Sequence, residues 1–154
     1  MPELPEVETI KRYLQKEIGG KTIIGIEVLS KKQFPNNPKE VIGAKIIGLE
    51  RRGKNLIIHL SNGKSLLIHL KLTGQLVWIP KMGRGRIKLG HPIPLGNEEL
   101  PGKTTRVVIS VNGGKLFFND LRKFGWMKIV KSSQLESIEL AKLGPEPFWP
   151  DFTE

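Results

Sequence analysis

Residues 55–70 read NLIIHLSNGKSLLIHL, and this stretch decides the fold class. Two runs rich in branched apolar residues, 55–60 and 65–70, flank Asn62-Gly63, a dipeptide that accepts the positive φ angles of a hairpin turn. Asn112-Gly113 marks a second hairpin in the same way. Six further runs of this kind occur, at 22–29, 44–50, 75–79, 105–111, 115–119 and 126–130. The pattern predicts an antiparallel β-sandwich or barrel.

Helices are predicted on either side of the strand-rich region. Apolar residues recur at steps of three and four between residues 5 and 18, which is typical of an amphipathic helix: Val7, Ile10, Leu14 and Ile18. Gly19-Gly20 ends this helix, and residues 1–4 are expected to precede it as a short arm. Near the other end, Ser132 or Ser133 is predicted to cap a short helix that Gly144-Pro145 terminates.

Residues 80–103 are rich in glycine and proline and form a longer connection than is usual in a compact domain. The sequence leaves two interpretations open, a surface loop or an extra hairpin. The basic residues of this stretch are either solvated or in contact with phosphate: Lys81, Arg84, Arg86 and Lys88.

The charge balance favours a polyanionic partner. Lys and Arg number 25 against 15 Asp and Glu, a formal net charge of +10, and neutralising phosphates releases condensed counterions. Charge alone also fits a merely soluble basic protein. No apolar stretch approaches the roughly 20 residues needed to cross a bilayer, so we expect no membrane partner.

Cysteine is absent from the sequence, which excludes a disulfide, a thiolate nucleophile and a zinc ribbon. The three histidines are scattered without metal-ligand spacing, so we expect no metal site. The composition fits a reducing interior, and we expect a cytoplasmic protein, associated with the nucleoid if the source is prokaryotic.

Pro2-Glu3 is the first pair of residues with chemical potential. If Met1 is removed, Pro2 becomes a secondary amine with a pKa of roughly 8, which can attack an aldehyde-level carbon and form an iminium. Glu3 could then move protons. The alternative is an ordinary start to a helix, with glutamates favoured by the helix dipole.

The opening run MPELPEVETI resembles the start of formamidopyrimidine-DNA glycosylases. Further blocks resemble this family in the same order: RRGKNLIIHL at 51–60, IHLKLTGQL at 68–76, NDLRKFGW at 119–126 and LGPEPF at 143–148. The resemblance implies a catalytic β-sandwich domain over residues 1–145 with an N-terminal and a C-terminal helix. Residues 146–154 would begin an interdomain linker. The family's helix-two-turn-helix and zinc-finger domains are absent from this chain, so no cofactor is expected in it.

The resemblance also implies a catalytic set. Pro2 matches the nucleophile, Glu3 the acid that protonates the opening sugar, and Glu6 a supporting carboxylate. Lys54 matches a turn lysine that contacts the phosphate of the lesion, and His69 a phosphate-contacting histidine. From the residues alone, Lys54 could be a solvated hairpin lysine and His69 a satisfied core histidine.

Three residues match the group that fills the gap left by a flipped nucleotide: Leu72, Arg122 and Phe124. Leu72 stands where methionine is usual, an exchange that keeps an apolar wedge of similar volume. Lys123 replaces a common arginine, and Leu121 a frequent proline. Arg106 falls where many members have a histidine, so phosphate contact is expected there as well.

The function implied by the resemblance is removal of oxidised purines, such as 8-oxoguanine and formamidopyrimidines, from duplex DNA through a proline Schiff base with β,δ-elimination. Endonuclease VIII, which prefers oxidised pyrimidines, shares the Met-Pro-Glu start, but the ELPEVET and DLRKFG blocks favour the formamidopyrimidine branch. A non-enzymatic DNA-binding or interaction module is the alternative. We expect a monomer whose partner is damaged double-stranded DNA, with a missing C-terminal half in cis in the full protein.

Overall fold

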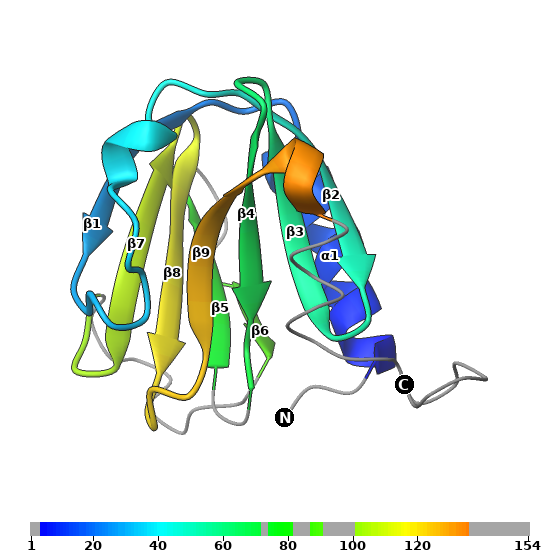
Figure 1. The fold of residues 1–154 in the computed structure, drawn as a ribbon. Helices are drawn as coiled ribbons and strands as arrows, with labels where there is room; N and C mark the ends of the chain where they lie inside the picture. Colours follow the sequence, from blue (N-terminus) through cyan, green and yellow to red (C-terminus); the bar gives the residue numbers. More distant parts are fainter. Residues whose placement is uncertain (1–3, 72–73, 82–86, 91–100, 136–154) are drawn as a thin grey trace.

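The computed structural model describes residues 4–71, 74–81, 87–90 and 101–135, and it consists of two antiparallel β-sheets with a helix along one side (Figure 1). The five-stranded sheet has the order β1-β7-β8-β5-β6, and the four-stranded sheet the order β2-β3-β4-β9. The first contains β1 (Ile23–Val28), β5 (Gly74–Pro80), β6 (Ile87–Gly90), β7 (Thr105–Val111) and β8 (Gly114–Asp120). The second contains β2 (Ile46–Arg52), β3 (Asn55–Leu60), β4 (Lys64–His69) and β9 (Trp126–Lys131).

The main core lies between the two sheets because alternate strand residues point to opposite faces. From the four-stranded sheet, Leu56, Ile58, Leu66 and Ile68 enter one buried cluster. The facing sheet supplies the other half: Leu76, Trp78, Val107, Ile109, Leu116 and Phe118. The predicted β-sandwich is therefore confirmed.

Helix α1 (Leu4–Ile18) covers the side of the sandwich where the edge strands β2 and β6 lie. Its apolar positions Ile10, Leu14 and Ile18 are buried in the main core, as the periodicity predicts. The helix ends where expected, since Gly20 has a φ of +83° and its N–H donates to the carbonyl of Ile46. No helix among the described residues is long and apolar enough to span a membrane.

The eight predicted strands all form, with bounds shifted by at most two residues. Of the two interpretations of residues 80–103, the extra hairpin is correct, because β6 pairs antiparallel with β5. Arg84 and Arg86 lie outside the described residues. Short 3₁₀ turns η1 (Pro38–Glu40) and η2 (Ser132–Gln134) complete the described elements.

The predicted serine cap is not found at η2. Lys131 precedes this turn and no side chain caps it. The hydroxyl of Ser132 is instead hydrogen-bonded to that of Ser65, 2.6 Å away, which ties η2 to β4. The rest of the predicted helix, residues 136–143, lies outside the described residues.

Candidate nucleic-acid interface

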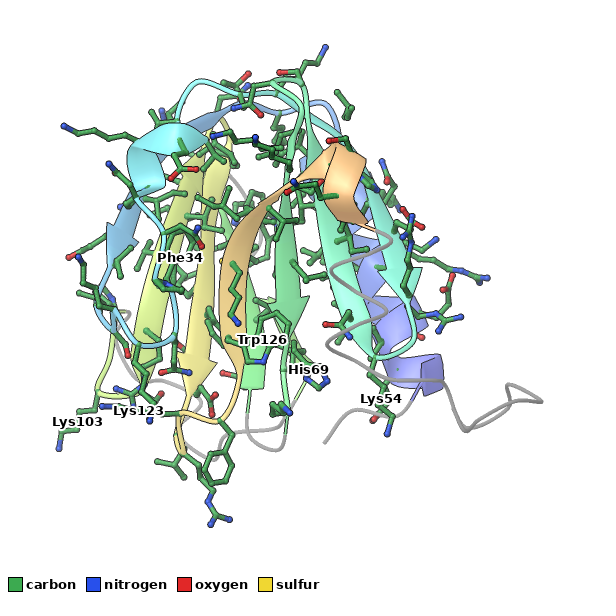
Figure 2. All side chains as sticks on the ribbon, viewed as in Figure 1. Phe34, Lys54, His69, Lys103, Lys123 and Trp126 are labelled. Carbon is green, nitrogen blue, oxygen red and sulfur yellow. The ribbon has the colours of Figure 1, made fainter. Side chains whose placement is uncertain are left out.

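Lys54, His69 and Lys123 lie toward one end of the sandwich, which we call the site end (Figure 2). In the four-stranded sheet, Asn55, His69 and Trp126 are register partners at this end. In the other sheet, Gly74 pairs with Asp120. The two sheets meet here because the N–H of Gly74 donates to the carbonyl of Leu70, 2.8 Å away.

Lys54 lies in the tight turn between β2 and β3, where Arg52 pairs with Asn55 and Gly53 has a φ of +60°. The Nη1 of Arg51 donates to the carbonyl of Gly53 at 2.9 Å, and its Nε contacts the carboxylate of Glu8 in α1 at 3.1 Å. These contacts hold the turn against the first half of α1. Hydrogen bonds from Arg51, then Arg12, lower the pKa of Glu8 from 4.5 to about 2.

His69 ends β4 and is 8% exposed. Its ring lies 5.7 Å from the ring of Trp126, centroid to centroid. Burial, then the charges of Lys71 and Lys54, lower the pKa of His69 from 6.5 to about 4, so the ring is neutral near pH 7. Because Nδ1 accepts a hydrogen bond from the N–H of Lys71 at 3.0 Å, the single ring proton resides on Nε2. His69 is therefore a neutral hydrogen-bond donor.

The β8–β9 loop, residues 121–125, carries an exposed aromatic side chain. Phe124 is 48% exposed, and the guanidinium carbon of Arg122 lies 5.1 Å from its ring centroid. This separation is typical of a cation–π contact. The pair offers one apolar and one cationic surface side by side, which suits contact with a nucleotide base.

Two lysines of the site end have backbone angles that are unusual for a residue with a side chain. Lys71 has a φ of +53° and Lys123 a φ of +59°, and they are the non-glycine residues with positive φ in the part of the chain that the structure describes. Such a conformation costs about 1 kcal/mol or more each and is seen mainly where surrounding structure imposes it.

Arg106, at the start of β7, is half-buried and donates from Nε to the carbonyl of Asp120 at 2.9 Å. It thereby supports the β8–β9 loop, and a phosphate contact from it stays a prediction. Lys103, just before β7, is exposed and lies at the same end as Lys123 (Figure 2).

Of the other predicted residues, Glu6 is exposed in the first turn of α1. Pro2, Glu3 and Leu72 lie outside the described residues. The described residues that flank positions 72 and 73, Lys71 and Gly74, are both at the site end.

Sequence reasoning missed two buried polar residues of the site end, Gln33 and Asp120, and the aromatic partner of His69, Trp126. Asp120 stood inside the recognised NDLRKFGW block, so the block marked its neighbourhood but not its contacts. Gln33 belongs to no motif, and its position became informative only through the tertiary fold.

No group of three or more His, Cys, Asp and Glu side chains gathers within the described ranges in a way that could hold a metal ion. Because the sequence also has no cysteine, its residues do not fit a structural zinc site of the finger type.

A cation-rich end with a neutral histidine donor and an exposed aromatic–arginine pair has the chemistry that suits an anionic partner. The model of the formamidopyrimidine-DNA glycosylase N-terminal domain matches residues 1–127. The chain therefore belongs to the formamidopyrimidine-DNA glycosylase family, and the resemblance found in its motifs is confirmed.

Individual relatives agree with this assignment. The formamidopyrimidine-DNA glycosylase of Carboxydothermus hydrogenoformans is 39% identical over an alignment of 158 positions, which covers 99% of this chain and 51% of that protein. The complex of Lactococcus lactis Fpg with an abasic site containing DNA superposes with a TM-score of 0.76 at 30% identity, covering 96% of this chain and 50% of that one. A complex of a Lactococcus lactis Fpg mutant with a Fapy-dG containing DNA gives a TM-score of 0.77 at 31% identity, with 96% and 51% coverage. The chain spans about half the length of the curated relatives it matches.

Proposed function

We propose that this chain is the catalytic domain of a base-excision-repair DNA glycosylase and abasic-site lyase that acts on oxidised purines in duplex DNA. The observation that supports it most is the assembly at one end of Lys54, His69 and the β8–β9 loop, next to the start of α1. The family membership and the complexes of relatives with abasic and Fapy-dG containing DNA support damaged DNA as the substrate, and the Fapy-dG complex favours the purine class.

The nucleophile is the amine of Pro2, freed by removal of Met1. Pro2 is two residues from Leu4, so the covalent chain limits its nitrogen to within roughly 7 Å of the start of α1. Arg51 contacts both Gly53 in the Lys54 turn and Glu8, four residues along α1 from Leu4, which supports a position of the helix start near that turn. A phosphate held by Lys54 and by Nε2 of His69 would bring the adjoining sugar within reach of this amine.

In the proposed reaction the lone pair of Pro2 attacks C1′ of the damaged nucleotide. The bond from C1′ to the base breaks and the base leaves with the bonding electrons, taking up the proton that the proline nitrogen loses. The nitrogen lone pair then forms the iminium as the bond from C1′ to the ring oxygen breaks, and Glu3 protonates that oxygen. The resulting iminium makes the neighbouring C–H protons acidic. Successive eliminations then break the 3′ and 5′ phosphate ester bonds. The chemistry uses an amine and carboxylic acids and needs no redox cofactor.

Lysine and arginine side chains serve to bind duplex DNA before this chemistry. Arg122, Phe124 and Leu72 would occupy the space vacated when the nucleotide rotates out of the stack, with the arginine facing the orphaned base. Lys123 and Arg106 would contact phosphates, and Glu6 would support the proton transfers.

Borohydride trapping tests the proposal directly. Chain whose N-terminus is shown by mass spectrometry to be Pro2 is incubated with an abasic duplex and borohydride, and a covalent adduct is expected. Pro2→Gly, which replaces the secondary amine by a primary one, should lose most of the adduct, whereas Pro5→Ala, which leaves the secondary amine of Pro2 intact, should keep it.

The outcome separates the two candidate classes of protein. Binding without an adduct favours a non-enzymatic DNA-binding module, and absence of both contradicts the proposal. The substrate assignment is checked by comparing release of 8-oxoguanine with release of an oxidised pyrimidine from otherwise identical duplexes. Faster release of the pyrimidine would place the chain functionally with endonuclease VIII.

A further inference from the structure

A buried hydrogen-bonded cluster beneath the β8–β9 loop has no role in the proposed function as described so far. It consists of Gln33, Asp120 and Gly125, and we call it the clamp. Gln33 is 1% exposed and Asp120 is fully buried. Within the described residues Oε1 of Gln33 has no hydrogen-bond partner, and an unmade buried bond costs about 1–3 kcal/mol, so the cluster depends on the bonds made by Nε2 of Gln33 and Oδ2 of Asp120.

The clamp joins the two ends of the loop. Oδ2 of Asp120, just before the loop, accepts from the N–H of Gly125 at 2.6 Å and from Nε2 of Gln33 at 3.1 Å. The same Nε2 donates to the carbonyl of Gly125 at 2.9 Å. Gln33 is itself fixed to β9, because its carbonyl accepts from the N–H of Met127 at 2.8 Å. Residues 121–124 thus connect two points whose separation is set by three hydrogen bonds.

The base of the loop also lies directly against His69, the residue proposed to donate a hydrogen bond to phosphate. A Cβ added to Gly125 would lie 2.7 Å from the carbonyl oxygen of His69 and 2.9 Å from Oδ2 of Asp120. The backbone of the loop can approach this closely only because residue 125 is glycine. The position of the loop relative to His69 is therefore fixed by contact.

The tip of the loop shows that its conformation is imposed. Lys123 has a φ of +59°, which is unfavourable for lysine, and Phe124 stays 48% exposed. A free four-residue segment would relax both features, whereas a segment clamped at its ends persists in them.

We propose that Gln33 and Asp120 are positioning residues that order the β8–β9 loop before DNA binds, so that Arg122 and Phe124 are already placed for insertion into the duplex. This inference rests on the proposed function. Its physical basis is that ordering a side chain at binding costs about 0.5–1.5 kcal/mol, and the clamp removes this cost from the step in which the nucleotide is flipped.

Two abasic substrates distinguish positioning from general stability. Insertion is needed to open a duplex, but a single-stranded abasic oligonucleotide has no stacked partner strand to displace. Gln33→Met keeps the volume of the side chain and removes both hydrogen bonds of Nε2. It should lower the trapping rate on duplex by about tenfold, the equivalent of about 1.4 kcal/mol, and leave the rate on the single strand within about twofold.

Ser65→Ala is the matched control, because Ser65 is buried and its hydroxyl makes two hydrogen bonds, to His59 and Ser132, away from the site end. It should lower thermal stability to a similar degree without changing the ratio of duplex to single-strand rates. Asp120→Ala removes the acceptor shared by both donors and should repeat the effect of Gln33→Met. An unchanged ratio in both clamp variants overturns the inference.

A measurement on the unaltered chain needs neither folded variants nor activity. The amide hydrogen of Gly125 should exchange as slowly as those within β9, while the amides of residues 122–124 exchange rapidly, with or without DNA. Fast exchange at Gly125 in the free chain contradicts the clamp. Absence of trapping on both substrates by the unaltered chain contradicts the proposed function instead, so the two failures can be told apart.

Discussion

Protonation of His69 should make the folded chain less stable in mild acid, by an amount that follows from its surroundings. In the fold, burial and the charges of Lys71 and Lys54 lower the pKa of this ring to about 4, whereas the unfolded chain has the ordinary value of 6.5. Between these values the unfolded state binds a proton that the folded state does not. The free energy of unfolding therefore rises with pH from about 4 to about 6.5 and is constant above.

The magnitude follows from the two pKa values. From about pH 7.5 down to about pH 5, proton binding to the unfolded ring alone lowers the free energy of unfolding by roughly 2 kcal/mol. This range lies above the ordinary pKa of glutamate, so the stabilisation that Glu8 gains from its lowered pKa is lost only at more acidic pH. Within the range, His69 can be observed with little interference from that carboxylate.

Urea unfolding monitored by tryptophan fluorescence at several pH values gives the required free energies. His69→Gln is the reference, because its amide oxygen can accept from the N–H of Lys71 and the side chain does not titrate. The free energy of unfolding of the unaltered chain should fall relative to that of His69→Gln as the pH is lowered. Parallel pH profiles for the two proteins, or an NMR titration that places the ring pKa near 6.5, would refute the reasoning.

Three further outcomes are expected. On duplex DNA near pH 7.5, Lys54→Gln should reduce the slope of log affinity against log salt by about 0.9, the value for one lost phosphate neutralisation. His69→Gln should weaken binding without changing this slope, because the ring is neutral. Equal slopes for both variants contradict this assignment. Lys123→Gly should raise the free energy of unfolding by up to about 1 kcal/mol in urea titration, since glycine adopts a φ of +59° without strain. A loss of stability would show instead that the lysine side chain makes stabilising contacts that outweigh the strain. Gly125→Ala should lower the melting temperature strongly, equivalent to about 2 kcal/mol or more, because its Cβ would lie less than 3.0 Å from two oxygen atoms. Gly48→Ala should change the melting temperature little, because the nearest atom to its Cβ would be 3.7 Å away. Similar shifts in the two variants would exclude the close contact at Gly125.

The parts of the fold that could be predicted are those encoded by neighbouring residues. The Asn62-Gly63 turn between two apolar runs specifies the β3–β4 hairpin locally, and the three- and four-residue steps specify α1 in the same way. The sequence does not decide between a surface loop and the β5–β6 hairpin, because β6 has four residues and lies in a glycine-rich stretch. The conformation of this segment depends on its pairing with β5. The sequence motifs likewise indicated Lys54, His69 and Arg122 without showing how they are held.

The contacts that hold the site depend on residues far apart in the sequence, which explains why sequence reasoning could not find them. Gln33 reaches Asp120 across 87 positions, and His69 meets Trp126 only because β4 pairs with β9. Neither pair leaves a periodic pattern or a spacing by which it could be identified in a single sequence. A buried glutamine in a polar stretch such as KKQF is indistinguishable from a solvated one until the fold is known.

Lys71 and Lys123, the two lysines with a left-handed backbone conformation, indicate that the site end is adapted to more than stability. Glycine at positions 71 and 123 would remove the conformational cost, as it does at Gly53 in the neighbouring turn. Lysine keeps the conformational cost and adds a positively charged side chain that starts from a constrained backbone. At position 71 the same backbone also donates to Nδ1 of His69, so the conformation that carries the charge is the one that keeps the histidine proton on Nε2. If phosphate binding is the purpose of this end, replacing Lys71 by glycine should preserve the histidine tautomer yet weaken DNA binding. The cation and the hydrogen-bond donor can therefore be separated by that substitution.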